Sequence, residues 1–397
     1  MRIVTQTSSA FAIYNARLVL EGAVVENGWL SVENGVIRDL GEGNLPEALI
    51  RDSFTSIDAG GQWIFPGFID LHIHGGDGYE VMDGTVKAID AVGRFHATRG
   101  TTGWLPTTLT APIDALERAL SASHEASLRQ EGGAQILGVH LEGPFISPDK
   151  CGAQNPEYVI PPSIELLERL TGIANGLVKK VTIAPERDGA LEAIRWMSSR
   201  GIIPSIGHTD GTLAQTLAGV RAGARHATHL FNAMRGLHHR EGGTVGAALL
   251  SDDVICELIA DGHHVDVDVM KLVYDVKGRE KLVLITDAMT AAGKPDGEYK
   301  LGELDVIVED GVAVLKEGHN LAGSTLTMDA AVRNMVRLVG VNPWDAAHMA
   351  ALVPARELGL QDRKGSVAVG KDADLVMMDE SLQVVATWVA GRQVFQR

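Results

Sequence analysis

Two histidines separated by a single residue, His72 and His74, end an apolar stretch that runs through residues 66–75. Alternate residues of a β-strand point to the same face, so the two imidazole rings would lie on one side, about 6.6–7 Å apart along the strand. Such a pair can bind a metal ion, because neutral imidazole is a common ligand of divalent metals. Two hydrogen-bonded histidines in an ordinary buried strand are the alternative interpretation of this short motif.

Other apolar stretches also end in side chains that bind metals or transfer protons, namely Glu142, His208, His229, Asp261 with His264, and Asp287. In (β/α)8 barrels the active site lies at the carboxyl ends of the strands, so these positions favour one shared site. Imidazoles and carboxylates without cysteine are typical ligands of Zn²⁺ or Fe²⁺. Either two ions bind, bridged by Glu142 or by a solvent oxygen, or one ion binds and the remaining groups contact a substrate.

The order of the expected elements supports a barrel. Apolar strands alternate with amphipathic helical segments, and the strands are expected near residues 65–74, 101–110, 136–144, 178–186, 201–209, 226–234, 254–264 and 281–289. This alternation predicts an α/β fold with a (β/α)8 TIM-like barrel over residues 64–364, and a doubly wound open sheet is the alternative. A β-hairpin insertion is expected near residues 296–320, before helices at 328–339 and 343–352.

Both ends of the chain show a different pattern, of short strands joined by turns. Residues 1–63 contain Glu-Asn-Gly twice, at 26–28 and 33–35, and Asn-Gly between alternating apolar residues is a hairpin signal. Residues 365–397 have the same texture. We expect the two segments to pair into one small β-sandwich domain beside the barrel.

The composition excludes several classes of partner. A formal net charge of −16 argues against nucleic acid, although a few local cations could still bind a small anion. No stretch reaches the roughly 18 apolar residues of a membrane helix, so no membrane association is expected. The chain has two cysteines, Cys151 and Cys256, and this low number favours a reducing, cytoplasmic location. Cys151 is expected to be either a reactive thiol on a loop or a small buried residue.

Several longer motifs carry a family resemblance. They are PGFIDLHIHG at 66–75, HLEGPF at 140–145, GHT at 207–209, HLFNAM at 229–234, ADGHHVD at 260–266, TDAM at 286–289 and LAGSTLTM at 321–328. With these motifs the chain resembles the amidohydrolase superfamily and, within it, the N-acetylglucosamine-6-phosphate deacetylase family. The resemblance covers essentially the whole chain and implies a metal-dependent hydrolase of amino-sugar metabolism that acts on a phosphorylated amino sugar.

The resemblance also implies roles for individual residues. Glu142, His208 and His229 would be the principal metal ligands, His72 and His74 would form a second metal position, and Asp287 would be the catalytic acid and base. The family further implies a homodimer in which Arg240 reaches the neighbouring pocket. The expected substrate-binding residues are Ala153, Gln154, Asn232, Ala233, Arg240, Asp261, His264, Leu321, Ala322 and Gly323.

One position departs from the family pattern. Members usually carry a histidine in the stretch that here reads Gly-Ala-Gln-Asn-Pro at 152–156, and Gln154 can donate a hydrogen bond to a carbonyl oxygen but cannot become cationic. This departure leaves open the turnover rate and the exact acyl sugar, such as the N-acetylgalactosamine epimer. A non-catalytic scaffold of the same fold would be expected to lose ligands, and none is lost here.

The fourth barrel strand carries no lysine at its end. Lys179 and Lys180 start this strand and are expected to be solvated. A carboxylated lysine, which bridges two metals in some relatives of the superfamily, is therefore not expected, and Glu142 would supply the bridging carboxylate instead. This disfavours a dihydroorotase or hydantoinase.

Overall fold

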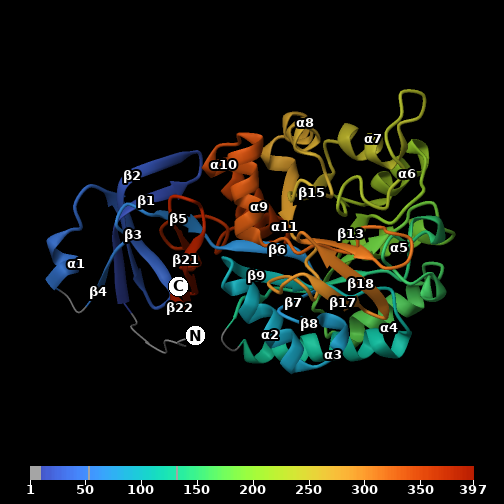
Figure 1. Cartoon of the computed structure of the whole chain (residues 1–397), viewed down its shortest axis with the longest axis horizontal. Helices are drawn as coiled ribbons and strands as arrows, with labels where there is room; N and C mark the ends of the chain where they lie inside the picture. Colours follow the sequence, from blue (N-terminus) through green and yellow to red (C-terminus); the bar gives the residue numbers. More distant parts are fainter. Residues whose placement is uncertain (1–9, 52–53, 131–132) are drawn as a thin grey trace.

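Residues 10–51, 54–130 and 133–397 are described by the computed structural model, in which strands from both ends of the chain form one mixed sheet (Figure 1). The strands run in the order β22-β21-β20-β5-β1-β2-β3, and β4 also pairs with β1. Their bounds are β1 (Ala10–Leu20), β2 (Ala23–Glu33), β3 (Val36–Glu42), β4 (Thr55–Asp58), β5 (Trp63–Pro66), β20 (Leu375–Met378), β21 (Val384–Val389) and β22 (Arg392–Gln396). Segments from the two chain ends therefore lie together in one β structure, as their sequence patterns predict.

The two Glu-Asn-Gly motifs have different structures. At the second, Asn34 and Gly35 have positive φ angles of 52° and 78° and form the tight turn between β2 and β3. The first motif lies inside β2, so the hairpin turn expected there is wrong. A Cβ atom on Gly28 would lie 2.6 Å from Leu18 Cγ, and the pairing of β1 with β2 shifts register beside it. Gly28 therefore allows β1 and β2 to approach each other closely, and it does not form a turn.

The larger part of the molecule contains parallel strands together with the helices that connect them (Figure 1). The parallel strands are β6 (Phe68–Ile73), β9 (Thr101–Pro106), β11 (Val139–Glu142), β12 (Val178–Ile183), β13 (Ile203–Ile206), β14 (His226–Ala227), β15 (Ile255–Ile259) and β16 (Leu282–Ile285). Strands β11 to β16 pair in chain order, and β6 pairs with β9. Bridges from Thr107 to His140 and from Ile73 to Ala288 join these two sheets at both edges. The strands thus form one curled parallel sheet whose edges are joined by these bridges, and the predicted α/β fold is confirmed.

Helices connect the barrel strands and pack around them. Their bounds are α2 (Val86–Ala97), α3 (Ile113–Arg129), α4 (Ile164–Ile173), α5 (Ala190–Ser198), α6 (Leu213–Ala222), α7 (Gly243–Leu250) and α8 (Val267–Lys277), and α1 (Glu47–Arg51) lies between β3 and β4. Capping residues set several starts, as at α2, where the Thr85 hydroxyl accepts a hydrogen bond from Ala88 N. The sequence does not predict α7, because its glycines and almost wholly apolar residues show no amphipathic period.

The segment after β16 holds the expected β insertion and helices. A three-stranded antiparallel sheet is followed by helices with π-helical turns, in the order β17 (Gly297–Leu301), β18 (Leu304–Glu309), β19 (Val312–Leu315), α9 (Met328–Asn334), π-turn Met335–Val339, α10 (Pro343–Ala347), π-turn His348–Leu352 and α11 (Val353–Glu357). The remaining strands are short: β7 (Gly75–Gly76) and β8 (Tyr79–Glu80) pair with each other, and β10 (Gln135–Ile136) pairs with β9. In the described part of the chain no helix is long and apolar enough to cross a membrane.

Candidate active site

The metal-type side chains lie where barrel strands end. His72 is in β6, Glu142 is the last residue of β11, and the others follow their strands within two residues, namely His74, His208, His229 and Asp287. Three backbones are left-handed, with φ of 46° at His208, 29° at His229 and 53° at Asp287. A non-glycine residue in this region costs about 1–3 kcal/mol, and such residues cluster at functional sites. The strand ends adopt strained conformations where they present these side chains.

The Glu142 carboxylate lies at the centre and contacts histidines on two sides. Its Oε1 is 3.2 Å from His229 Nε2 and 3.5 Å from His208 Nε2, and these two nitrogens are 3.1 Å apart. Its Oε1 also lies 3.3 Å from His72 Nε2, and its Oε2 lies 3.2 Å from His74 Nε2. Glu142, His208 and His229 form one group with the spacing of metal ligands, and Glu142 joins it to the other two histidines.

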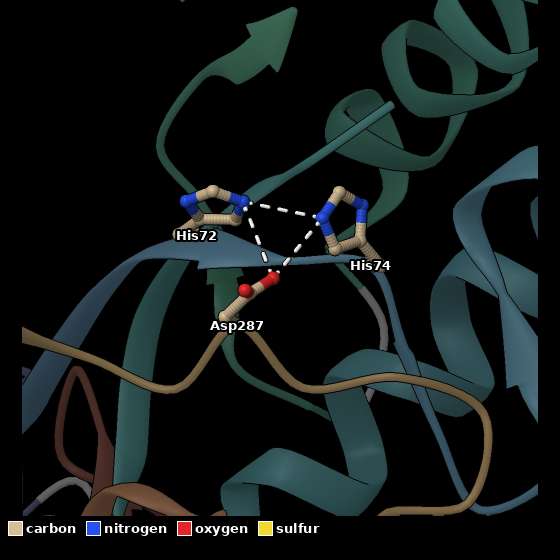
Figure 2. Close-up of side chains that lie close together, drawn as sticks. All are labelled: His72, His74 and Asp287. Carbon is tan, nitrogen blue, oxygen red and sulfur yellow. Dashed lines mark hydrogen bonds and ion pairs between the residues drawn. The ribbon is translucent and has the colours of Figure 1, made fainter. Parts of the chain in front are cut away.

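His72, His74 and Asp287 form a second such group (Figure 2). Asp287 Oδ1 lies 3.4 Å from His72 Nε2 and 3.2 Å from His74 Nε2, and the two nitrogens are 3.1 Å apart. Both contacts are made by the same carboxylate oxygen, Oδ1, which the dashed lines of Figure 2 join to the two rings. The geometry therefore brings Oδ1 of Asp287 into the group.

Backbone carbonyl groups orient two of the histidines. His74 Nδ1 is 3.1 Å from Thr107 O, and His208 Nδ1 is 2.9 Å from Lys150 O. A carbonyl oxygen can only accept, so each Nδ1 carries a hydrogen atom, and in the neutral ring each Nε2 would present its lone pair to the cluster. This is the arrangement in which metal-binding histidines are usually held.

The donor set fits a divalent cation. Ligands about 2.0–2.2 Å from a tetrahedral ion lie about 3.3–3.6 Å apart, close to the 3.1–3.5 Å separations within the two groups. Burial disfavours a charged imidazole, but the carboxylates of Glu142 and Asp287 outweigh it and raise the pKa of His72 to about 10 and that of His74 to about 9. The cluster therefore attracts positive charge, as a cation site must.

A cavity of about 370 Å³ opens directly onto this cluster. Most of the expected site residues line it: His74, Glu142, Ala153, Gln154, His208, His229, Asn232, Ala233, His264, Asp287, Leu321 and Gly323. Gln154 is buried, its Nε2 donates to Glu142 Oε2 at 2.7 Å, and its Oε1 accepts from Thr110 N at 2.6 Å. The neutral amide at this position thus holds the central carboxylate at the wall of the cavity.

Comparison with known proteins agrees with this geometry. The family model described as "Amidohydrolase family" matches residues 63–394. The chain belongs to the amidohydrolase family. Within it the chain groups with the N-acetylglucosamine-6-phosphate deacetylases: it is 39% identical to the one from Bacillus subtilis over 391 residues, 98% of each chain. It is also 42% identical to an N-acetylgalactosamine-6-phosphate deacetylase from Escherichia coli O157:H7 over 376 residues, 95% of this chain and 97% of that one.

Solved structures in the same family superpose closely on the fold. A mutant of N-acetyl-D-glucosamine-6-phosphate deacetylase from Mycobacterium smegmatis, in complex with N-acetyl-D-glucosamine-6-phosphate, matches with a TM-score of 0.91. The two chains are 35% identical, and the match covers 98% of this chain and 100% of that chain. Amidohydrolases are metal-dependent, and the two groups of imidazoles and carboxylates could bind a metal in this chain.

Some expected residues lie outside the cavity wall. Asp261 accepts a hydrogen bond from His264 Nδ1 at 2.6 Å and so orients that ring, and Ala322 is buried with its N–H donating to Ala313 O. Arg240 is exposed on the loop between β14 and α7, where its guanidinium lies 2.8 Å from His239 Nε2. Within its own chain Arg240 therefore does not contribute to the cavity that Asp287 faces.

Sequence reasoning missed several polar residues around the site. Lys180 is fully buried and pairs with Glu257, so the expectation that it is solvated is wrong. It lies within β12, and its side chain points into the barrel, where Glu257 of β15 meets it. Glu257 is likewise buried within the apolar strand β15. Lys150 lines the cavity. A charged residue inside an apolar strand is the signal that could have identified Lys180 and Glu257.

Proposed function

We propose that this chain removes the acetyl group from N-acetylglucosamine-6-phosphate, giving glucosamine-6-phosphate and acetate. The observation that carries the proposal is the cavity: Glu142 at its wall links two groups of imidazoles and carboxylates, and Asp287 faces the same space. Relatives that match nearly the full length of the chain are named for this reaction. The chemistry of the site and the names of its relatives therefore agree.

The donor set supports the following roles for the metal ligands. Glu142, His208 and His229 would hold the principal divalent ion, and His72 and His74 would complete a second position. Histidine and carboxylate ligands favour Zn²⁺ or Fe²⁺, one or two per subunit. When bound, such an ion makes water more acidic and polarises a carbonyl group.

Asp287 would be the residue that transfers protons during the reaction. Its contacts with the two histidines are made by Oδ1 (Figure 2), so the second oxygen, Oδ2, would accept the proton of the attacking water. The amine is a poor leaving group as an anion and needs a proton as the carbon–nitrogen bond breaks. The same Oδ2 would return that proton to nitrogen, which makes Asp287 both base and acid in one cycle.

Cations around the cavity would hold the phosphate group. Of the described residues that line the cavity, Lys150 is the one lysine or arginine. His264, fixed by Asp261, would add a donor, and Arg240 would reach in from the second subunit of a homodimer. Loop backbone at Ala153, at Asn232 and Ala233, and in residues 321–323 would hold the sugar. Both cysteines are free thiols, which fits a cytoplasmic enzyme.

A panel assay tests the function. Purified protein is given N-acetylglucosamine-6-phosphate, its galactosamine and mannosamine counterparts and the three unphosphorylated sugars, and free amine is measured. We expect activity on a phosphorylated sugar, loss of activity in strong chelator and recovery with Zn²⁺ or Fe²⁺. Full activity in chelator by protein that contains no transition metal would refute the metal site, and no amine release from any phosphorylated sugar would refute the reaction.

The galactosamine epimer is the second candidate substrate. The observation that favours it is the 42% identity to the Escherichia coli enzyme named for N-acetylgalactosamine-6-phosphate. The same panel separates the two substrates, because the ratio of their kcat/KM values reports directly which epimer the site prefers. A higher kcat/KM for the galactosamine epimer would replace the first assignment.

A further inference from the structure

A buried ion pair crosses the barrel interior beneath the metal-type cluster. The side chains of Lys180 in β12 and Glu257 in β15 are both 0% exposed and contact each other. Strands β13 and β14 lie between β12 and β15 in the sheet, so the pair spans the inside of the curled sheet. Taking two charges out of water is costly, and apolar residues of similar volume often give an equally stable core. A contribution to the stability of the fold therefore does not by itself explain why Lys180 and Glu257 are buried together.

Glu257 also contacts two residues of the cluster. Its Oε2 accepts a hydrogen bond from the backbone N–H of His229 at 3.3 Å and lies 3.5 Å from His72 Nδ1. In Figure 2 the Nε2 atom of His72 faces His74 and Asp287, while its other ring nitrogen lies on the opposite side of the ring. Glu257 therefore lies behind His72, on the side away from Asp287.

This contact sets His72 apart from two of its neighbours. The Nδ1 atoms of His74 and His208 face backbone carbonyl groups, whereas Nδ1 of His72 faces a carboxylate. A carboxylate behind a ligating histidine fixes which nitrogen carries the hydrogen and makes the other nitrogen a stronger donor to a metal. The carboxylate in turn needs a nearby countercharge in the apolar interior, which Lys180 supplies.

We propose that Glu257 and Lys180 are positioning residues for the second metal position. Glu257 holds Nδ1–H of His72, directs Nε2 towards His74 and Asp287, and anchors the backbone of His229. Lys180 keeps the Glu257 carboxylate in place and compensates its charge. The proposal rests on the metal centre of the proposed function, and it concerns metal affinity rather than contact with substrate.

Metal titration of variants tests the proposal. Zn²⁺ binding to metal-free protein is measured by competition with a coloured chelator, and the thermal midpoint is measured on the same samples. His72→Ala identifies the binding step that belongs to the second position. Glu257→Gln, which keeps the shape of the side chain, should weaken that same step by about 10–100-fold.

Two further variants separate positioning from stability. Asp374→Asn disrupts another buried ion pair, Lys364 with Asp374 at 2.7 Å next to β20, and should lower the thermal midpoint without changing Zn²⁺ affinity. The double variant Lys180→Met with Glu257→Gln removes both buried charges, so its stability should recover relative to Glu257→Gln. Its Zn²⁺ affinity should remain low, because no carboxylate then faces Nδ1 of His72.

Three results with these variants, and one with His72→Ala, would overturn the proposal. The three are unchanged Zn²⁺ binding in Glu257→Gln, recovery of affinity together with stability in the double variant, and an equal loss of affinity in Asp374→Asn. Absence of a binding step that depends on His72 would overturn it as well. Wild-type protein that binds no Zn²⁺ or Fe²⁺ would instead refute the metal centre itself, so the two failures are distinguishable.

Discussion

Gln154 provides a sharp test of how the central carboxylate is held. Its amide links Thr110 N to Glu142 Oε2 through hydrogen bonds of 2.6 and 2.7 Å, and its side chain is only 4% exposed. Replacement by alanine removes a hydrogen bond to a charged group, worth about 1.5–3 kcal/mol, and leaves a buried backbone N–H without its acceptor, which costs about 1–3 kcal/mol. Gln154→Ala should therefore lower the free energy of unfolding by several kcal/mol.

The effect on activity follows from the first of these terms alone. If the bond to Glu142 contributes fully to the orientation of that carboxylate, its loss lowers kcat/KM by roughly 10–150-fold, because about 1.4 kcal/mol corresponds to a factor of ten. Gln154→Glu is the matched variant: it keeps an acceptor for Thr110 N and the same length, but it places a second carboxylate against Glu142. We expect it to retain more stability than Gln154→Ala and to lose activity.

Urea unfolding and steady-state deacetylation measure the two effects separately. Zn²⁺ affinity adds a third measurement, since a residue that orients Glu142 affects metal binding, whereas a residue that only contacts the substrate amide affects KM alone. If Gln154→Ala unfolds at the same urea concentration as wild type and deacetylates at the same rate, both hydrogen bonds are dispensable and the reasoning is refuted.

Two further predictions concern the phosphate group. Lys150→Met should raise KM for the phosphorylated sugar by roughly 10–150-fold, the range for a lost hydrogen bond to a charged group, and should leave KM for the unphosphorylated sugar nearly unchanged. Steady-state kinetics measure both values, and the control is Lys316→Met, which removes a lysine paired with Glu298 beside the β insertion. Equal KM values for Lys150→Met and Lys316→Met would exclude Lys150 from phosphate binding. Arg240→Ala mixed with Asp287→Asn under subunit exchange should regain part of the wild-type activity, because one hybrid pocket combines both intact residues; no recovery despite demonstrated exchange would place Arg240 in its own subunit's pocket or in a structural role.

The fold was predictable because alternating strand and helix patterns repeat along the chain and end in recognisable polar residues. Strand ends at Glu142 and Asp287 could be read directly, since the carboxyl ends of barrel strands meet at one rim. The first Asn-Gly motif does not form the expected turn because Gly28 packs closely against Leu18, and the sequence does not state which neighbour approaches a glycine.

The interior of the barrel was harder to predict. Lys180 and Glu257 are far apart in the sequence, and only the curled sheet brings their side chains together. The sequence predicts a solvated Lys180 because a lysine is almost never fully buried unless it is paired, and the sequence of β12 contains no acidic partner for it. Long-range pairing of charges is information that local patterns do not contain.

The sheet shared by both chain ends has a consequence for synthesis. Strand β5, which leads directly into the strand of His72, pairs with β20, roughly 300 residues later in the chain. At about 5–20 residues per second, β5 waits on the order of 15–60 s on the ribosome before its partner exists. During that interval β5 can pair only with β1, and its other edge remains open to unintended strands. A stall after residue 66 and before residue 375 should therefore favour aggregation of this chain more than a stall of equal length before residue 63, when β5 does not yet exist.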